Sequence, residues 1–575
     1  MRRVAACLAA LTTAAALAGC GLTASPAPSA AATATGEYLV FYADGGRGEA
    51  LAAIERAGGR TVATDSKLGY ALAKGAGDAF VDALGSSPAV VGVSTDRRIG
   101  FASARSADPG GAGTGGAGNG GAGNGGAGNG GAAQPAARAA AHPDATALAS
   151  EQAGDEPLAG RQWDMRMIGA DRARAKAPGT RKVLVGVIDT GIDGKHPDIA
   201  PNFNRELSRN FVTDRPKDPD GDTLDGTCEV SGCKDPVDRD DDGHGTHVAG
   251  TIASPVNGVG IAGVAPGVQL VNIRAGQDSG YFFLKPSLDA LTYAADIGVD
   301  VVNMSYYVDP WLFNCADNPA DSKKQRLEQR AVITGMQRAL DYARKKGVTL
   351  VSALGNGATD LGRPTVDRHS PGYPRGGEKV RKVDNSCLNV PAESKGVISV
   401  SAVGPSGRKA LYSDYGVEQT DVAAPGGDLL DGKGASATRA ILAPAPQDVL
   451  RRSGKLDGSG TPKTADVVRD CRDGACSYYQ YLEGTSMAAP HATGVAAILI
   501  SRFGKPGKGG VTLDPATVER LLYRTATPTA CPQPRTYAYK IYGDTERHVC
   551  AGGRTKNGFY GHGVVDAWKA ATVAR

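Results

Sequence analysis

The sequence predicts an α/β protein in which a doubly wound parallel sheet is flanked by helices and is preceded by a small α+β domain. Continuous β-branched runs such as Val183–Ile188 are typical of strands that are covered on both faces. Helical patterns at Pro286–Ile297 and Arg330–Lys346 alternate with these runs, and such alternation favours parallel strands joined by helices. The other runs predicted as strands are Val268–Ile273, Val299–Met304, Val348–Val351 and Val397–Val403.

The small α+β domain is predicted at residues 37–100. A strand at Tyr38–Tyr42 precedes a helix at Gly48–Ala57, and a second helix at Ala76–Leu84 precedes a last strand at Val90–Val93. Two short strands near residues 61–64 and 68–73 complete a β-α-β-β-α-β order, which is the ferredoxin-like split unit. The segment contains no His and no Cys, so it has no predicted chemistry of its own.

A disordered linker is predicted at residues 101–150. Residues 110–132 repeat Gly-Gly-Ala-Gly-Asn with a period of five. Such a composition cannot bury enough apolar surface to become ordered. The tract therefore marks the boundary before a large domain at residues 151–575.

The charge balance argues against nucleic acid as a partner. Lys and Arg number 64 against 60 Asp and Glu, which gives a formal net charge of +4 in 575 residues. Nucleic-acid binders usually show a basic excess or a clustered basic stripe. The sequence shows neither.

An export signal is predicted at residues 1–20. Arg2 and Arg3 precede an apolar run, Val4–Gly19, that is too short for a membrane span. The run ends in Leu-Ala-Gly-Cys, which resembles the lipobox of bacterial lipoproteins and makes Cys20 the expected lipidation site. The alternative is an ordinary secretory signal that contains a Cys. Either interpretation predicts a secreted protein, and the first also predicts a precursor anchored to the outer face of the membrane.

Eight cysteines remain after Cys7 and Cys20, and an even number suits an oxidising compartment. Eight cysteines formally allow 105 pairings, so counting does not give the connectivity. None shows the CxxC spacing of a zinc site, which makes metal ligation the weaker interpretation. Proximity in sequence favours the pairs Cys228–Cys233, Cys471–Cys476 and Cys531–Cys550, which leaves Cys315 with Cys387.

Three motifs carry candidate catalytic residues. Asp189 lies in Ile-Asp-Thr-Gly-Ile-Asp, where a predicted buried strand ends. His244 lies in Asp-Gly-His-Gly-Thr-His-Val-Ala-Gly and Ser486 in Gly-Thr-Ser-Met-Ala-Ala-Pro-His, each at the start of a predicted helix. Asp, His and Ser in this order and with these flanking residues resemble the subtilisin family of serine proteases over about residues 162–570.

This resemblance implies a role for each motif residue. A serine hydroxyl is a poor nucleophile until a base takes its proton, so His244 is the expected general base and Asp189 the group that orients it. The expected oxyanion hole consists of Asn356, in Ser-Ala-Leu-Gly-Asn-Gly, and the backbone amide of Ser486. No cofactor is expected for this chemistry.

The resemblance also implies an organisation for the chain. Residues 151–575 are expected to be a subtilisin-like peptidase domain, and residues 37–100 its inhibitory propeptide. The expected product is a monomeric, self-processed secreted endopeptidase whose partners are protein or peptide substrates and its own propeptide.

Specificity does not transfer from the resemblance, because the sequence departs from the family at the wall of the primary pocket. The usual Ser-Leu-Gly-Gly is Ser305-Tyr306-Tyr307-Val308 here, and Tyr for Gly adds bulk along the expected substrate channel. Two insertions, at about 309–330 and 428–481, are predicted to be loops that shape the cleft. The residues expected to contact substrate are Ser305, Tyr306, Tyr307, Ala353, Gly355 and Asp242.

Residues 240–242 are three consecutive aspartates directly before the His244 motif. In the family this segment borders the second substrate subsite, so an acidic group there is expected to favour a basic side chain one residue before the cleaved position. The alternative is a solvated acidic loop in which Asp242 points away from the cleft.

A structural calcium ion is a further expectation from the resemblance. Nine residues separate Asp189 from Asp198 and twenty-two separate His244 from Pro266, and both spacings match those of subtilisin. Oxygen ligands suit this hard cation. The expected ligands are the side chains of Asp198 and Asn257, the carbonyls of Pro255, Val259 and Ile261, and Asp155 or Glu156 as an N-terminal ligand. A separate acidic loop at 218–222 is either another ion site or a solvated turn.

Two hypotheses about function remain open. The first is an active secreted endopeptidase, and the second is a proteolytically dead protein that uses the same scaffold to bind peptides. All four expected catalytic positions are intact, whereas a dead copy usually loses at least one of them. The sequence therefore favours the active enzyme.

Overall fold

The computed structural model describes residues 35–95, 156–214, 228–374, 376–541 and 544–574. The predicted signal segment with Cys20, the linker at 101–150, Asp155 and the acidic loop at 218–222 lie outside these residues. Within the described part of the chain, no helix is long and apolar enough to cross a membrane.

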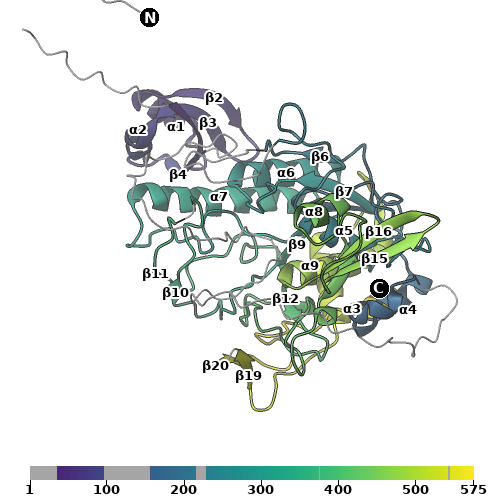
Figure 1. The fold of residues 1–575 in the computed structure, drawn as a ribbon. Helices are drawn as coiled ribbons and strands as arrows, with labels where there is room; N and C mark the ends of the chain where they lie inside the picture. The colour runs from purple at the N-terminus through teal and green to yellow at the C-terminus, as the bar shows by residue number, and fades with distance from the viewer. Residues whose placement is uncertain (1–34, 96–155, 215–227, 375, 542–543, 575) are drawn as a thin grey trace, which may run out of the picture. The chain divides into compact units, whose positions relative to one another are not determined.

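Residues 35–95 form a four-stranded antiparallel sheet and two helices, which confirms the predicted β-α-β-β-α-β order (Figure 1). The strand order in the sheet is β2-β3-β1-β4. The elements are β1 (Thr35–Tyr42), α1 (Arg47–Arg56), β2 (Arg60–Asp65), β3 (Tyr70–Ala76), α2 (Gly77–Leu84) and β4 (Val90–Thr95).

The alternation of side chains along β1 explains how this sheet is covered on both faces. Tyr38 and Val40 belong to an apolar cluster with α1 and α2. Leu39 and Phe41 point the other way and belong to a cluster that contains Met336 of α7 (Lys323–Lys345). The small domain therefore packs against a helix of the large domain.

The large domain is built on a seven-stranded sheet with the order β13-β12-β9-β8-β5-β7-β6, in which every strand pair is parallel. The chain enters at β5 and builds outward on both sides, which confirms the predicted doubly wound sheet. The strands are β5 (Leu184–Ile188), β6 (Arg209–Asn210), β7 (Gln269–Arg274), β8 (Val301–Met304), β9 (Thr349–Ala353), β12 (Ile398–Val403) and β13 (Val422–Pro425).

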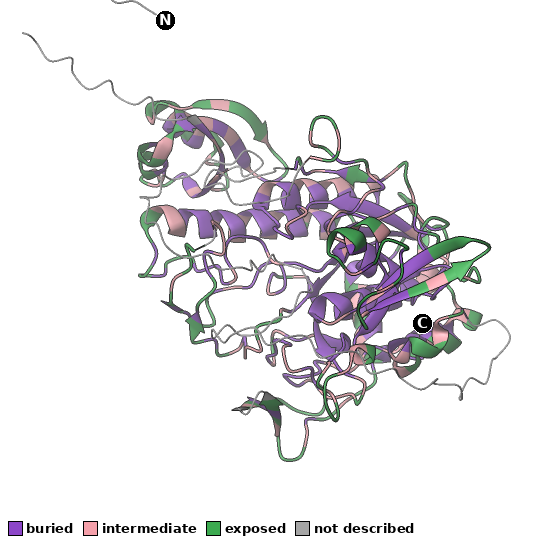
Figure 2. Cartoon of the chain, in the orientation of Figure 1, coloured by how far each residue is buried: buried purple, intermediate pink, exposed green. Residues whose placement is uncertain are grey.

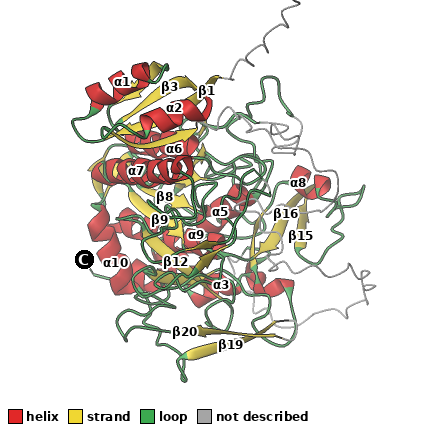
Figure 3. Ribbon diagram, turned by 90° about the vertical axis from the view of Figure 1, so that its left-hand side faces the viewer, coloured by secondary structure: helices red, strands yellow, loops and turns green. Residues whose placement is uncertain are grey.

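Helices cover both faces of the sheet, as Figure 3 shows. Val185 and Val187 of β5 pack in one core cluster with α5 and α9, whereas Leu184 and Ile188 pack on the other face with α6 and α7. This burial of consecutive residues is why the strands read as continuous apolar runs. The helices of the large domain are α3 (Trp163–Met167), α4 (Ala170–Lys176), α5 (His244–Ala253), α6 (Leu284–Ile297), α7, α8 (Gln447–Arg452), α9 (Thr485–Phe503), α10 (Pro515–Thr525) and α11 (Ala567–Thr572).

Helix α7 begins earlier than the sequence predicts. The helix was expected at Arg330–Lys346 after a loop, but it starts at Lys323. Ser322 and Gln325 form a reciprocal capping box at its first turn, which satisfies two of the amides that a helix start leaves open. Leu327 is buried against the small domain, so packing holds the added turns in place.

The prediction of a loop at 428–481 is wrong. This insertion folds into a three-stranded antiparallel sheet, β14 (Ile441–Pro444), β15 (Val467–Arg472) and β16 (Ala475–Leu482), with helix α8 beside it. Tyr479 and Tyr481 pack on one side with Ile261, and Tyr478 packs on the other side with Leu450 of α8. Because both faces of β16 are covered, its apolar residues do not alternate with polar ones in the sequence. The exposed part of the β15–β16 hairpin lies at its tip (Figure 2).

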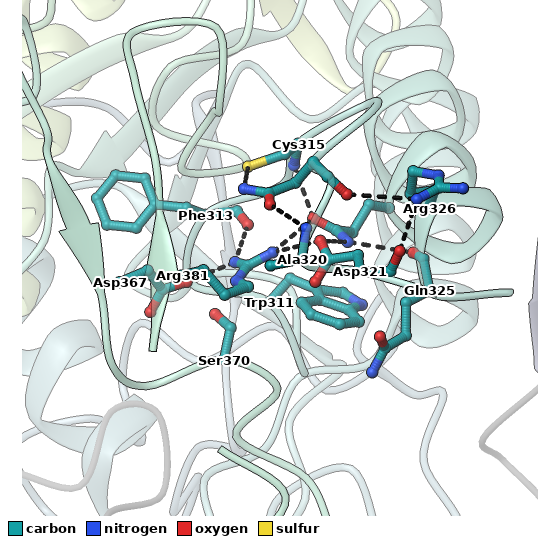
Figure 4. A network of polar contacts seen from close by, with 12 residues as sticks. Trp311, Phe313, Cys315, Ala320, Asp321, Gln325, Arg326, Asp367, Ser370 and Arg381 are labelled. Carbon is teal, nitrogen blue, oxygen red and sulfur yellow. Dashed lines mark hydrogen bonds and ion pairs between the residues drawn. The ribbon is translucent and has the colours of Figure 1, made fainter. Parts of the chain in front are cut away.

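The first insertion is organised around a buried arginine (Figure 4). We call Arg381, its partners Asp321 and Asp367, and the indole of Trp311 the Arg381 cluster. The Arg381 guanidinium pairs with both carboxylates and lies 4.9 Å from the centre of the Trp311 ring. A cation, two anions and an aromatic face thus form a charge-paired polar core.

Four disulfide bonds join the predicted pairs, which are the three favoured by sequence proximity, Cys228–Cys233, Cys471–Cys476 and Cys531–Cys550, and the remaining pair Cys315–Cys387. The remaining elements are β10 (Val366–Asp367), β11 (Arg381–Lys382), β17 (Lys505–Gly507), β18 (Gly510–Thr512), β19 (Thr536–Ile541), β20 (Asp544–Val549) and the short 3-10 turns at Ala159–Arg161 and Ala437–Arg439.

Candidate active site

The fold brings the three candidate catalytic residues to the carboxyl edge of the parallel sheet. Asp189 directly follows β5, His244 is the first residue of α5 and Ser486 is the second residue of α9. Their exposed fractions are 0%, 3% and 7%, so the site is shielded from bulk water. Ligands of doubly wound sheets commonly bind at this edge, where the strand order reverses.

Asp189 and His244 form a buried hydrogen-bonded pair. Nδ1 of His244 lies 2.7 Å from Oδ1 of Asp189, and the amide of Thr190 donates to the same oxygen at 2.8 Å. Gly245 permits this approach, because a Cβ there would lie 2.1 Å from the carbonyl oxygen of Gly191. Among the described residues, Nε2 of His244 has no hydrogen-bond partner.

Nearby carboxylates set the electrostatics of His244. Burial lowers its pKa, but the charge and hydrogen bond of Asp189, with the charges of Asp242 and Asp240, outweigh burial and raise the pKa to about 9. The neutral imidazole, which is the form that accepts a proton, is therefore favoured only in alkaline solution.

The three consecutive aspartates have different environments. Asp240 is buried and accepts from the amides of Gly243 and Thr246, so it caps the start of α5. Asp241 pairs with Arg239 and Arg452. Asp242 is half-buried and accepts from the amide of His244 at 3.0 Å. Among the described residues, Asp241 is thus the one aspartate of the three that pairs with cationic side chains, whereas the charges of Asp240 and Asp242 act on the histidine without such a partner.

Ser486 lies in the first turn of α9, where Ser305 supports it. Pro490 cannot donate to the carbonyl of Ser486, and Oγ of Ser305 donates to that carbonyl instead at 3.0 Å. Oγ of Ser486 donates to the carbonyl of Ser305 at 3.2 Å, so its hydroxyl is not bonded to His244 here. Two hydrogen bonds thus join Ser305 to Ser486.

Asn356 has a fixed side-chain orientation. Its Oδ1 accepts from the amide of Thr485 at 2.9 Å and from the hydroxyl of Thr485 at 2.8 Å. Because the oxygen is committed to these bonds, Nδ2 is the available donor. The amide of Gly355 in turn donates to the Thr485 hydroxyl at 3.1 Å. Thr485 was not singled out from the sequence, although it lies inside the serine motif.

The other expected substrate-contact residues have different degrees of burial. Tyr306 is buried and stacks on Phe282 with ring centres 4.2 Å apart, whereas Tyr307 is half-buried. Ala353 ends β9, and Gly355 follows it in a backbone conformation with φ of +129°. Between the two tyrosines, Tyr307 has the more accessible side chain.

The expected calcium ligands gather around the loop at 255–261. Oε1 of Glu156 accepts from the amide of Asn257 at 2.7 Å, and Oδ2 of Asp198 accepts from the amide of Ile261 at 2.9 Å. Oε2 of Glu156 and Oδ1 of Asp198 are buried without a hydrogen-bond partner among the described residues. Burial raises the pKa of Asp198 to about 8, and the charge of Glu156 contributes to the rise. Two orphaned buried carboxylate oxygens fit a cation.

In the same loop, Oδ1 of Asn257 accepts from the amide of Val259 at 3.0 Å, and its Nδ2 donates to the carbonyl of Pro197 at 3.2 Å. Pro255 is buried.

A second acidic group was not predicted. Carboxylate oxygens of Glu229, Asp235, Asp241 and Asp278 lie within 4.8 Å of one another. The buried guanidinium of Arg274 pairs with Asp235 at 2.6 Å and with Asp278 at 2.9 Å, and Arg239 pairs with Asp241. These arginines offset much of the negative charge.

One buried pair near the nucleophile also had no signal in the sequence. Nε2 of His491 lies 3.0 Å from Oδ2 of Asp164, and Nδ1 of His491 lies 2.8 Å from the carbonyl of Met487. The pair joins α3, near the start of the large domain, to α9, the helix that carries Ser486. No motif surrounds Asp164, so only the fold reveals the contact.

An Asp–His pair beside a serine at a helix start, with an oriented amide donor nearby, is the constellation of a serine hydrolase. The model of the subtilase family matches residues 180–563, and the chain belongs to this family.

Curated relatives are similar over the same region. Subtilisin DY of Bacillus licheniformis is 27% identical over 64% of this chain and 91% of its own length. The thermophilic serine proteinase of Bacillus sp. (strain AK1) is 28% identical over 60% of this chain but only 58% of its own length.

Among solved structures, the epidermin leader peptide processing serine protease of Staphylococcus aureus has a TM-score of 0.57 at 21% identity and covers 94% of this chain and 99% of its own. At that identity the likeness concerns the fold.

Proposed function

We propose that this chain is an active serine endopeptidase that hydrolyses peptide bonds through Asp189, His244 and Ser486. The observation that carries the proposal is the buried His244–Asp189 bond of 2.7 Å, which leaves Nε2 open on the side of the imidazole that a serine would use. Membership of the subtilase family and the intact serine and amide-donor positions support it.

Acylation requires one rotation and two proton transfers, and deacylation requires two more, from water to His244 and from His244 back to Oγ of Ser486. The Ser486 hydroxyl turns from the Ser305 carbonyl to Nε2 of His244, which takes its proton while Oγ bonds to the substrate carbonyl carbon. His244 then gives the proton to the leaving amine as the C–N bond breaks. Water repeats the sequence and releases the acyl group, while Asp189 stabilises the imidazolium throughout.

Two donors are proposed for the oxyanion. Nδ2 of Asn356 is available because its Oδ1 is committed to Thr485, and the Ser486 amide belongs to the open first turn of α9. Preorganised donors of this kind act where negative charge develops, in a site screened from water.

Residues 37–100 are proposed to be an inhibitory propeptide that the enzyme removes itself. The contacts of the small domain with α7 support this role. The Arg338 guanidinium of α7 donates to the carbonyls of Tyr42, Leu68 and Gly69 at 3.0–3.2 Å, and Lys67 pairs with Asp296 at 2.6 Å. A domain held by such contacts can remain bound after the chain is cut.

Self-processing is tested with Ser486→Ala in a purified preparation free of other proteases. The variant is expected to remain a full-length precursor, whereas the wild type matures. Maturation of the variant at the wild-type rate would mean that this serine does not perform the cut.

Calcium is proposed to bind at Glu156, Asp198 and Asn257, with carbonyls of Pro255, Val259 and Ile261. Such an ion supplies positive charge that compensates buried carboxylates, and it stabilises the fold without entering the chemistry. The orphaned oxygens of Glu156 and Asp198 support the site.

Secretion and lipidation of Cys20 complete the proposal. The self-cleavage is expected between about residues 99 and 156, so it would separate a lipid on Cys20 from the catalytic domain. Cells that express Ser486→Ala are expected to hold the precursor in the membrane fraction. A precursor found wholly in the culture fluid would contradict lipidation and leave an ordinary secretory signal.

A further inference from the structure

The loop that carries Asn356 rests on a buried carboxylate that the proposed mechanism does not use. Asp414 lies between β12 and β13, and its exposed fraction is 2%. Its Oδ1 accepts from the amide of Thr359 at 2.7 Å. The amide of Gly357 also stabilises the charged carboxylate. The two amides lie on the C-terminal side of Asn356, one and three residues beyond it.

Backbone bonds from the same segment hold the loop at both ends. The amide of Asp414 donates to the carbonyl of Gly355 at 2.9 Å, and the amide of Ala358 donates to the carbonyl of Tyr412 at 2.7 Å. The amide of Tyr415 donates to the carbonyl of Thr359 at 3.0 Å. Residues 355–359 and 412–415 therefore form one hydrogen-bonded unit, and Asp414 contributes both backbone and side chain to it.

The carboxylate also limits the space beneath the loop. A Cβ at Gly355 would lie 2.1 Å from Oδ2 of Asp414, and φ of Gly355 is +129°, so only glycine fits here. Gly355 directly precedes Asn356. This close approach of Gly355 to the Asp414 carboxylate restricts movement of the loop in the direction of that carboxylate.

Keeping this carboxylate buried has an energetic cost. Burial raises the pKa of Asp414 to about 7, against the opposing effects of the Thr359 amide, Lys409 and the Gly357 amide. An apolar side chain would avoid that cost but would leave the loop amides without their acceptor. The Asp414 carboxylate therefore acts as the acceptor that fixes the conformation of the loop at 355–359.

We propose that Asp414 is a positioning residue that holds Asn356 where its Nδ2 can donate to the developing oxyanion. The proposal rests on the proposed peptidase activity and extends it to a residue that touches neither the substrate nor the triad. Removal of Asp414 lets the loop relax, so the loss should fall on the transition state and pass through Asn356.

The test is a double-mutant cycle of Asp414→Ala and Asn356→Ala in the mature enzyme, with active sites counted by a fluorophosphonate titration. Asp414→Ala alone should lower kcat about 10-fold to 100-fold with little change in KM, because the lost interaction acts in the transition state. In the Asn356→Ala background the same substitution should change kcat by less than about threefold, because coupled residues are not additive.

Two further variants separate positioning from simple stability. Asp414→Asn keeps an acceptor oxygen for the Thr359 amide, so its kcat should fall less than that of Asp414→Ala. If the Asp414→Ala protein does not fold, Asp414→Asn takes its place in the double-mutant cycle. Asp300→Ala is the control, because Asp300 is also a buried carboxylate that accepts a backbone amide, from Leu184 at 2.9 Å, away from the Asn356 loop. It should lower the melting temperature and leave kcat per titrated site unchanged.

An equal loss of kcat from Asp414→Ala in both backgrounds would overturn the inference, as would a fall in stability with kcat per site intact. The peptidase activity itself is tested separately, with Ser486→Ala. If Ser486→Ala were as active as the wild type, the peptidase mechanism itself would be wrong, whereas a normal loss in Ser486→Ala and Asn356→Ala with no effect of Asp414→Ala would remove only the positioning role.

Discussion

The Asp189–His244 pair and the Arg381 cluster both bury ionisable groups, but they differ in which atoms are bonded. Arg381 uses both terminal nitrogens, each with two acceptors: Asp321 and Gln329 for Nη1, and Asp367 and the Phe313 carbonyl for Nη2. Nε of Arg381 and Oδ1 of Asp321 have no hydrogen-bond partner among the described residues, but Lys379 lies 2.8 Å from that oxygen and the cluster pairs its charges. In the Asp189–His244 pair, Nε2 of His244 and Oδ2 of Asp189 have no hydrogen-bond partner among the described residues, and His244 pairs with a single carboxylate.

An open polar atom in a buried site is costly, which makes the open Nε2 of His244 a candidate for chemistry. The Arg381 cluster pairs its charges and holds an insertion in place, whereas the open Nε2 of His244 is the atom that the proposed reaction uses. Substitutions in the two regions should therefore separate activity from stability.

The largest effect is expected from His244→Ala. Without the base, kcat should fall by about 10⁶-fold, a magnitude taken from subtilisin itself. KM should change little, because the imidazole contributes mainly to the transition state. Steady-state kinetics on a chromogenic peptide, with the wild type diluted to matched rates, provide the measurement. A loss of less than tenfold would show that His244 is not the base.

Arg381→Met should have the opposite effect to His244→Ala, because it should lower stability and leave kcat unchanged. Removal of the cation leaves Asp321 and Asp367 buried without their partner, which should lower the free energy of unfolding by about 3–5 kcal/mol. The value of kcat per titrated site should stay near that of the wild type. Arg363→Met, at an exposed arginine outside the cluster, is the control and should change stability by less than about 0.5 kcal/mol. If denaturant unfolding gave the same stability for Arg381→Met and Arg363→Met, the structural role of the Arg381 cluster would be contradicted.

Removal of calcium should destabilise the protein by an intermediate amount. If the free ion is at about one hundred times its dissociation constant, its binding contributes about 2.7 kcal/mol, and a chelator should lower the melting temperature accordingly. Glu156→Gln should abolish this response because it removes one of the orphaned carboxylates. Glu229→Gln, in the acidic group around Arg274, should keep it. An unchanged melting temperature of the wild type on chelation would argue against the ion.

The smallest expected effect is a shift of the pH profile. His244 accepts a proton only when neutral, so activity should be lost as the pH falls through its raised pKa. Asp242 is one of the charges that raise this pKa, and Asp242→Asn should move the acidic limb of kcat/KM to lower pH. Asp241→Asn is the control, because Arg239 and Arg452 already offset that carboxylate. If the acidic limb of kcat/KM lay at the same pH in Asp242→Asn and in the wild type, this electrostatic account would be contradicted.

The sequence predicts those parts of the site that depend on local signals. A buried run ending in Asp189 and two helix starts with His244 and Ser486 are readable because each residue lies beside the element that positions it. The parallel sheet is readable for the same reason: strands covered on both faces have continuous apolar runs.

The parts that could not be predicted depend on contacts between distant segments. Asp414 acts on a loop more than fifty residues earlier, and Asp164 meets His491 only after the domain has folded. The inserted sheet was missed because β16 buries both faces, so Tyr478 and Tyr479 occur together without alternation. The early start of α7 depends on Leu327 packing against the small domain.

The most direct test of the central claim is covalent labelling by a serine-directed fluorophosphonate, followed by intact-mass and peptide mass spectrometry of the mature enzyme. The account predicts a single adduct on Ser486, much slower labelling of His244→Ala and none of Ser486→Ala, with Arg381→Met labelled at the wild-type rate while folded. A wild-type protein that takes no label, or an adduct that persists in Ser486→Ala, would contradict it and favour a scaffold that binds peptides without cleaving them.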